Sequence, residues 1–155
     1  MSDTAAPTQI AEVQAILDKN LPLEGPLLPI LHDVQSAFGC VPDAVRPQIA
    51  EALNITQAEL HGVISFYHDF RREPAGTRVL KICRAEACQA VGANDLSAKV
   101  LDMLGLDWHG TSADGRITVE PVYCLGLCAC GPAAMIDGVL KGRATADALV
   151  QEVSP

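Results

Sequence analysis

Residues 83–88 read CRAEAC and residues 124–128 read CLGLC, so four of the six cysteines stand in two tight pairs. A C-x4-C pair and a C-x3-C pair each put two sulfur atoms on one loop, and folding can bring two such loops together around one ion or cluster. The most economical product is a set of four thiolates that enclose an iron-sulfur cluster. The two pairs therefore predict a thiolate-bound metal centre.

Two other uses of paired cysteines compete with this prediction. Disulfides are typical of small secreted chains, whereas residues 1–8 are small and polar and contain no apolar signal segment. Structural zinc also takes four thiolates, and its usual spacings overlap those seen here. The C-x4-C pair is wider than the usual zinc knuckle, and backbone N–H groups in the small, apolar loop 125–127 can point at sulfur. The pattern favours iron and sulfide, with zinc as the alternative.

The other two cysteines are predicted to pack rather than to bind metal. Cys128 and Cys130 are separated by one residue, so either sulfur could serve as the fourth ligand. We expect Cys128 to be the ligand and Cys130 to be a buried small hydrophobe. Cys40 lies far from both pairs and follows Gly39 at a predicted helix end. We expect packing for Cys40 as well.

The composition disfavours nucleic acid and membrane partners. Acidic residues exceed basic ones by 19 to 11, and the formal charge of -8 opposes contact with phosphates. Aromatic residues make up only 4%, which removes the stacking platforms that single-strand binders need. No run of eighteen residues is free of charged and polar side chains, so no transmembrane helix is predicted. We expect a soluble, cytoplasmic protein.

Helical periodicity dominates the first 70 residues. Apolar residues recur at helical spacing over residues 8–20 and 26–38, and Gly39 is placed to take the left-handed conformation at the end of the second helix. Asp43 looks like the N-cap of a third helix that runs to about residue 53. Residues 56–59 read TQAE, a capping box that opens a fourth helix extending through residues 61–67. Residues 1–73 are thus predicted to form a four-helix lobe.

The pattern changes after the loop 74–76, where we expect the domain boundary. Residues 77–82 alternate like a strand that leads into Cys83, and a strand over residues 117–123 delivers Cys124. A helix over residues 90–104, with Val91 on its apolar face, is predicted between them. Asp137-Gly138 predicts a hairpin turn between strands 133–136 and 139–141, and a last helix covers residues 145–153.

This order of elements predicts a thioredoxin-like α/β domain over residues 77–155, with each cysteine pair just after a strand. Together with the helices before it, the chain is expected to have the α+β class: an N-terminal helical bundle lobe followed by a thioredoxin-like α/β domain.

The sequence contains no recognisable catalytic machinery. No phosphate-binding glycine fingerprint follows the first strand, and the C-x2-C of a redox dithiol is absent. The four histidines are scattered without a two-at-i,i+4 metal pattern and are expected to be packed or surface residues; they are His32, His61, His68 and His109. We therefore predict no catalytic residue.

The full cysteine spacing, C-x4-C-x35-C-x3-C, resembles that of the thioredoxin-like [2Fe-2S] ferredoxin subunits of NADH-dehydrogenase-type complexes. The resemblance covers nearly the whole chain. Further matches are the segments 39–43, GCVPD, and 62–67, GVISFY, which are typical of the family's helical lobe. The ligands of a [2Fe-2S] cluster that this resemblance implies are Cys83, Cys88, Cys124 and Cys128.

Short flanking segments distinguish among the complexes of this family. Residues 82–90 depart from the segment common in respiratory complex I, in which an arginine-glycine pair often follows the second cysteine. They look more like the gamma subunit of soluble, NAD-dependent, molybdenum-containing formate dehydrogenases, as do residues 65–70 and 128–132. The equivalent subunit of complex I or of an NAD-linked hydrogenase is an alternative. A zinc-stabilised interaction domain is the alternative of another class.

The resemblance implies a non-catalytic electron-transfer subunit that holds one [2Fe-2S] cluster near a flavin and acts as relay or electron store. Formate oxidation and NAD reduction each move two electrons, and the flavin splits the pairs. The implied partners are a flavin-containing, NAD-binding beta subunit and a catalytic alpha subunit. FMN, NAD, further iron-sulfur clusters and the molybdenum cofactor are expected only on those partners. The helical lobe is expected to dock on the flavin subunit.

Overall fold

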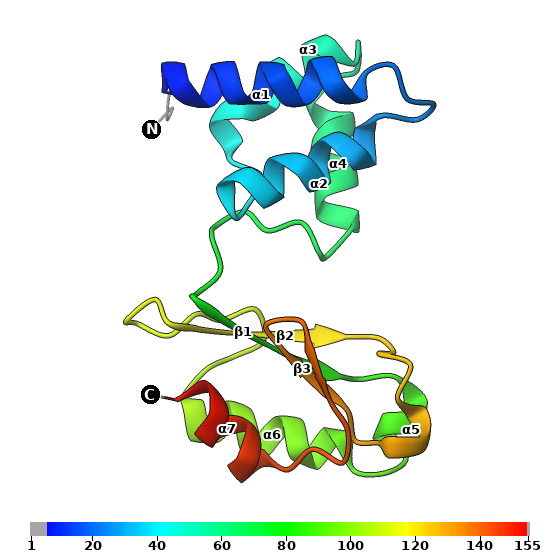
Figure 1. Cartoon of the computed structure of the whole chain (residues 1–155), viewed down its shortest axis with the longest axis vertical. Coiled ribbons are helices and arrows are strands. Elements are labelled where there is room, and N and C mark those ends of the chain that lie inside the picture. The colour runs from blue at the N-terminus through cyan, green and yellow to red at the C-terminus, as the bar shows by residue number, and fades with distance from the viewer. Residues whose placement is uncertain (1–5, 155) are drawn as a thin grey trace. The chain divides into compact units, whose positions relative to one another are not determined.

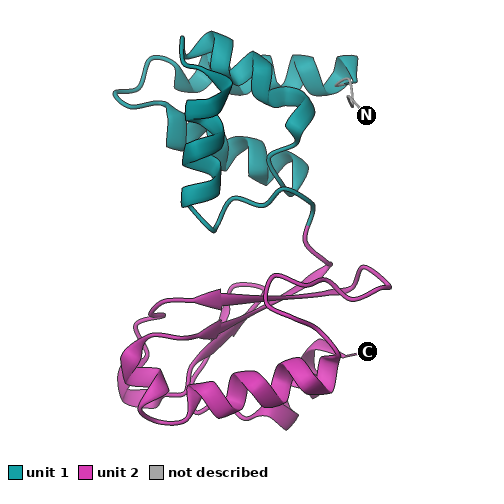
Figure 2. Ribbon diagram, turned by 180° about the vertical axis from the view of Figure 1, so that it is seen from behind, with its two compact units in different colours: residues 1–74 teal, residues 75–155 magenta. Residues whose placement is uncertain are grey.

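A computed structural model describes residues 6–154 of the chain, which divides into two compact units (Figure 2). The helical unit comprises residues 1–74, and the sheet unit comprises residues 75–155. Among the described residues, the regular elements of the first unit are all helices, and those of the second are a four-stranded sheet with helices. The predicted α+β class is confirmed. No helix within residues 6–154 has both the length and the apolar character needed to cross a bilayer.

Between residues 6 and 74, the helical unit has four α-helices and one short 3-10 turn (Figure 1). The elements are α1 (Pro7–Asn20), α2 (Leu27–Phe38), η1 (Asp43–Val45), α3 (Arg46–Ala52) and α4 (Gln57–Phe66). Their apolar stripes meet in one core, whose largest fully buried side chains are Leu17, Ile30, Leu31, Ile49, Leu60 and Ile64. Full burial of each such side chain contributes roughly 1.5–3 kcal/mol. This unit carries its own core.

Three helix caps are predicted in this unit, at Gly39, Asp43 and Thr56, and those at Gly39 and Thr56 are confirmed. Gly39 has φ 75° and ends α2 in the left-handed conformation. Thr56 caps α4: its hydroxyl accepts the N–H of Glu59 at 3.1 Å, and the Glu59 carboxylate accepts the N–H of Thr56 at 2.8 Å. Such a cap is worth about 1 kcal/mol.

The predicted N-cap at Asp43 is wrong. Asp43 opens the 3-10 turn, and the α-helix begins only at Arg46. The physical reason is that the Asp43 carboxylate pairs with the Arg46 guanidinium at 2.7 Å instead of accepting a backbone N–H.

The sheet unit contains four strands in the order β2-β1-β3-β4. They are β1 (Arg78–Cys83), β2 (Ile117–Val122), β3 (Ala134–Ile136) and β4 (Val139–Lys141). β1 and β2 are parallel, whereas β3 runs antiparallel to both β1 and β4. The helices α6 (Ala93–Leu104) and α7 (Ala146–Val153) lie together on one face of the sheet (Figure 1). Apolar residues of β1, β2 and β3 pack against them.

The helix between the two cysteine loops differs from the prediction. A short helix, α5 (Glu86–Gln89), carries Cys88, and Gly92 at φ 97° separates it from α6. Val91 therefore lies outside the helix and is 52% exposed, instead of belonging to its apolar face. The hairpin turn between β3 and β4 is confirmed, because Asp137 and Gly138 both have positive φ, 49° and 86°.

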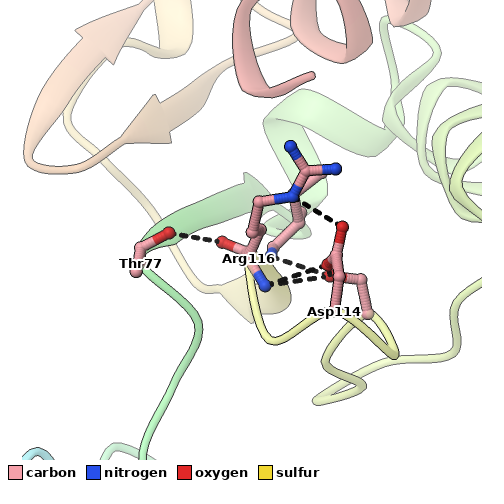
Figure 3. Close-up of polar contacts among 5 residues, drawn as sticks. Thr77, Asp114 and Arg116 are labelled. Atoms are coloured by element: carbon pink, nitrogen blue, oxygen red, sulfur yellow. Dashed lines mark hydrogen bonds and ion pairs between the residues drawn. The ribbon is translucent and has the colours of Figure 1, made fainter. Parts of the chain in front are cut away.

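The turn that precedes β2 is held by Asp114 (Figure 3). Its carboxylate accepts the Ser112 hydroxyl at 2.5 Å and the Nε of Arg116 at 2.6 Å. The Thr77 hydroxyl, just before β1, donates to the carbonyl oxygen of Arg116 at 3.2 Å. These contacts join the starts of the two parallel strands, where Arg78 pairs with Ile117. The same register aligns the carboxyl ends of β1 and β2, where Cys83 lies opposite Val122.

The Asp114 turn leads to a prediction for the carboxyl pKa. The hydrogen bond from Ser112, followed by those from Arg116, lowers the pKa of Asp114 from 3.8 to about 2. Because this folded-state pKa is lowered, the contacts stabilise the fold above the ordinary carboxyl pKa, and their contribution is lost as the pH falls through about 2. Titration of the Asp114 carboxyl carbon by NMR should give a midpoint near 2.

The variants S112A and T77V provide the matched comparison. S112A should raise the pKa of Asp114 towards its ordinary value, because it removes the largest contribution. T77V should leave the pKa unchanged, because the Thr77 hydroxyl contacts a backbone carbonyl and not the carboxylate. A midpoint near 3.8 in the unmodified chain would contradict this account of the turn.

Candidate metal centre

The paired parallel strands bring the two cysteine loops to one edge of the sheet. Cys83 is the last residue of β1 and lies opposite Val122, the last residue of β2. The Arg84 N–H donates to the Val122 carbonyl at 2.8 Å, and the Cys83 N–H donates to the Ala133 carbonyl at 2.9 Å. The loops after β1 and β2 and the segment before β3 therefore meet at the predicted ligands.

The first two cysteines form a buried pair. Cys83 and Cys88 are each only 1% exposed, and their thiols are hydrogen-bonded to each other. The loop between them closes tightly, because the Cys88 N–H donates to the Ala85 carbonyl at 3.0 Å. Ala93 and Ala133 complete the small apolar cluster around the pair. These two sulfur atoms are shielded from water.

The other two predicted ligands form an exposed pair. Cys124 and Cys128 are both exposed, and their sulfur atoms lie 3.8 Å apart. The loop turns sharply between them, with φ 79° at Cys124 and 77° at Gly126. A positive φ costs a non-glycine residue about 1 to 3 kcal/mol, and such strain is concentrated at functional sites. The backbone at Cys124 is therefore held in a costly conformation at a predicted ligand.

Backbone N–H groups are directed at the Cys83 sulfur. Burial has the largest influence on this thiol and raises its pKa, but the hydrogen bonds from Ala85, Cys124, Cys88 and Leu125 together bring the pKa of Cys83 below its ordinary value. Donors aimed at sulfur stabilise the thiolate form, which is the form that binds metal. Peptide groups of both loops thus favour the thiolate form of Cys83, a predicted ligand.

The pKa values of Cys88 and Cys128 are raised, in contrast to that of Cys83. Burial, followed by the hydrogen bond with Cys83, raises the pKa of Cys88. The hydrogen bond with Cys124, followed by the charge of Cys124, raises the pKa of Cys128. Each pair resists the loss of both protons, because the second thiolate would lie beside the first. A bound metal centre supplies the positive charge that compensates for this repulsion.

The donor set fits a two-iron cluster. The four thiols are arranged as two pairs, and a [2Fe-2S] cluster with four cysteine ligands takes two thiolates on each iron. Within residues 6–154, no group of three or more Cys, His, Asp or Glu side chains is gathered tightly enough to hold a single metal ion. When bound, such a cluster supplies one-electron chemistry.

The two remaining cysteines lie outside this donor set in different ways. Cys40, 5% exposed, is packed in the helical unit as predicted. Cys130 is only half-buried, so the prediction of a buried residue needs correction. A Cβ built on Gly142 would lie 2.9 Å from the Cys130 Cβ, so the two residues are closely packed. The Cys130 carbonyl accepts the N–H of Arg143 at 2.6 Å. The backbone at Cys130 is thus tied to the loop after β4.

A polar network that sequence reasoning missed supports the loop of Cys88. The Arg84 guanidinium lies over the Trp108 ring, 5.3 Å from its centroid, and donates to the Asn94 side chain at 3.1 Å. The Gln89 amide donates to the Arg84 carbonyl at 2.8 Å and accepts from Asn94 at 3.3 Å. The sequence signal for this network is that Arg84 and Gln89 directly follow the predicted ligands Cys83 and Cys88.

Comparison with solved structures identifies a similar fold. An NAD+-reducing [NiFe]-hydrogenase in the air-oxidized state matches 82% of this chain with a TM-score of 0.66 and 24% sequence identity. The present chain corresponds to only 22% of that hydrogenase chain. At this level of identity the similarity concerns the fold.

Relatives in sequence are more similar. An NADH-quinone oxidoreductase subunit of Pseudomonas aeruginosa is 36% identical over 121 residues, which cover 78% of this chain and 73% of the relative. The NADP-reducing hydrogenase subunit HndA of Solidesulfovibrio fructosivorans is 32% identical over 122 residues, covering 79% and 71%. The model of the thioredoxin-like [2Fe-2S] ferredoxins matches residues 13–154, which confirms the predicted family and its fold. The chain belongs to the thioredoxin-like [2Fe-2S] ferredoxin family.

Proposed function

We propose that this chain binds one [2Fe-2S] cluster through Cys83, Cys88, Cys124 and Cys128 and transfers electrons within an NAD-linked oxidoreductase complex. The observation that carries the proposal is the convergence of the two cysteine pairs at the ends of adjacent parallel strands. The family match and the names of the relatives support it. The cluster domain comprises residues 77–155 in this proposal, and residues 1–73 form a lobe that docks on a partner.

The complex that we propose is a soluble, cytoplasmic, NAD-dependent formate dehydrogenase, which couples formate oxidation to NAD reduction. Support comes from residues 82–90, which lack the arginine-glycine pair common after the second cysteine in complex I. The partners would be a flavin-containing, NAD-binding beta subunit and a catalytic alpha subunit. These subunits would carry FMN, NAD, further iron-sulfur clusters and the molybdenum cofactor, whereas this chain contributes no catalytic residue.

The equivalent subunit of a respiratory NADH dehydrogenase or of a hydrogenase is the second candidate. It is favoured by the relatives, which are named as an NADH-quinone oxidoreductase subunit and an NADP-reducing hydrogenase subunit. The two candidates assign the same role to this chain. A two-electron reaction on a partner requires a flavin that splits electron pairs, and a one-electron centre beside the flavin relays or stores the single electrons.

Serine substitutions test the proposed ligand set. C124S should abolish most binding of iron and acid-labile sulfide, because it removes one of the four thiolates. C130S is the matched control, since Cys130 lies two residues from Cys128 but outside the proposed donor set. It should retain the iron and sulfide content of the unmodified chain. If C130S lost the iron while C128S kept it, the assignment of Cys128 as the fourth ligand would be wrong.

A second experiment distinguishes the candidate complexes. The complex is purified from its native source through an affinity tag on this chain and assayed for reduction of NAD by formate and by hydrogen, and for oxidation of NADH by quinone. We expect formate to reduce NAD, and we expect molybdenum and FMN to copurify. Reduction by hydrogen, or quinone-linked NADH oxidation without formate activity, would contradict the formate dehydrogenase assignment and favour the second candidate.

A further inference from the structure

A single peptide group connects the side chain of Gln89 to a predicted ligand. The Arg84 carbonyl accepts the Gln89 side-chain amide at 2.8 Å, and the N–H of the next residue, Ala85, is hydrogen-bonded to the Cys83 sulfur. This carbonyl and this N–H belong to the same planar peptide unit, so the orientation of one fixes the orientation of the other. Gln89 therefore holds the peptide group that donates to the sulfur.

The neighbours of Gln89 fix the orientation of its side-chain amide. A guanidinium only donates hydrogen bonds, so the oxygen of the Asn94 side chain faces Arg84, at 3.1 Å. The Asn94 nitrogen is then free to donate to the Gln89 side-chain oxygen at 3.3 Å. This contact leaves the Gln89 nitrogen facing the Arg84 carbonyl. The direction of each donor in the network follows from the one before it.

The network is anchored outside the cysteine loop at two points. The Arg84 guanidinium lies 5.3 Å from the centroid of the Trp108 ring, and Trp108 packs against the core of the sheet unit. A cation over an aromatic ring contributes about 0.5–1 kcal/mol at an exposed site. Asn94 belongs to the first turn of α6. The Gln89 amide is thus held relative to the sheet unit and not only relative to its own loop.

A hydrogen bond to a ligand sulfur acts on the redox equilibrium of the centre. When an iron-sulfur cluster is reduced, the negative charge on its ligands increases, so an N–H donor stabilises the reduced form more than the oxidised form. A peptide whose carbonyl accepts a hydrogen bond also becomes a stronger donor at its N–H. Gln89 is neutral and supplies both effects to Ala85 without adding a charge.

We propose that Gln89 is a positioning residue for the redox centre: by holding the Arg84 carbonyl, it aims the Ala85 N–H at the Cys83 sulfur and raises the reduction potential of the cluster. This inference rests on the proposed function. The reduction concerned takes one electron from the redox partner, which is oxidised by one electron. No bond of this chain is made or broken, and no proton is transferred by it.

The reduction potential of the isolated, cluster-loaded chain tests this role. Q89L removes the donor at similar volume and without a change in charge. In an EPR-monitored redox titration, the equilibrium constant for reduction should fall at least threefold, which is about 28 mV at about 59 mV per tenfold for one electron. Q48L is the matched control, because the Gln48 amide also donates to a backbone carbonyl, that of Ile10 at 3.2 Å, but in the helical unit. The potential of Q48L should equal that of the unmodified chain.

Pulsed EPR separates the aimed hydrogen bond from a general loosening of the loops. The chain is labelled with [15N]alanine and reduced, because the Ala85 N–H donates to the Cys83 sulfur and the Ala133 N–H donates to the Cys88 sulfur. In Q89L the nitrogen coupling of Ala85 should fall at least twofold, whereas that of Ala133 should persist. Retention of both couplings, or loss of both, would overturn the positioning role.

The outcomes separate this inference from the proposed function. If Q89L does not retain the cluster, N94A takes its place, because the Asn94 amide orients that of Gln89. An unchanged potential in the variant that retains the cluster overturns the inference and leaves the proposed function intact. Loss of the cluster from both variants also overturns it, since the network would then serve cluster binding itself. An unmodified chain that binds no cluster contradicts the proposed function.

Discussion

The parallel pairing of β1 and β2 is the constraint on which the proposed centre depends. Strand register is specified by the alternation of side chains, and a shift by one residue would turn the buried side chains to the other face. In the observed register Cys83 lies opposite Val122, so the loops after both strands begin at the same level. Asp114, Arg116 and Thr77 secure the opposite ends of these strands. The approach of the two cysteine loops to each other follows from this register.

The electrostatics of the four thiols explain why the site suits a metal cluster. Burial, followed by the hydrogen bond with Cys83, raises the pKa of Cys88, and the hydrogen bond with Cys124, followed by its charge, raises the pKa of Cys128. At Cys83, burial raises the pKa, but the hydrogen bonds from backbone N–H groups and from Cys88 outweigh it and lower the pKa below its ordinary value. The repulsion between neighbouring thiolates is balanced when iron is bound. The chain therefore combines two cysteine pairs of different character. Cys83 and Cys88 are buried, and backbone N–H groups donate hydrogen bonds to the Cys83 sulfur, whereas Cys124 and Cys128 are exposed.

Much of the fold was predictable from local chemistry, and the errors have physical causes. The capping box at Thr56, the left-handed Gly39 and the Asp137-Gly138 turn each depend on a few adjacent residues, so the sequence alone predicts them. Val91 has the apolar character of a helix face, but the left-handed Gly92 interrupts the helix after it. The amide groups aimed at Cys83 and the exposure of Cys124 arise from loops that meet only after folding, and no sequence pattern marks them.

The central claim, that these four thiols hold a two-iron cluster, is tested most directly by electron paramagnetic resonance of the isolated chain before and after reduction with dithionite. The account predicts a red-brown protein that is silent when oxidised and gives a rhombic or axial signal when reduced, with iron and sulfide in equal amounts. A colourless, zinc-loaded chain that stays silent on reduction, and that takes up no iron and sulfide on reconstitution, would contradict it.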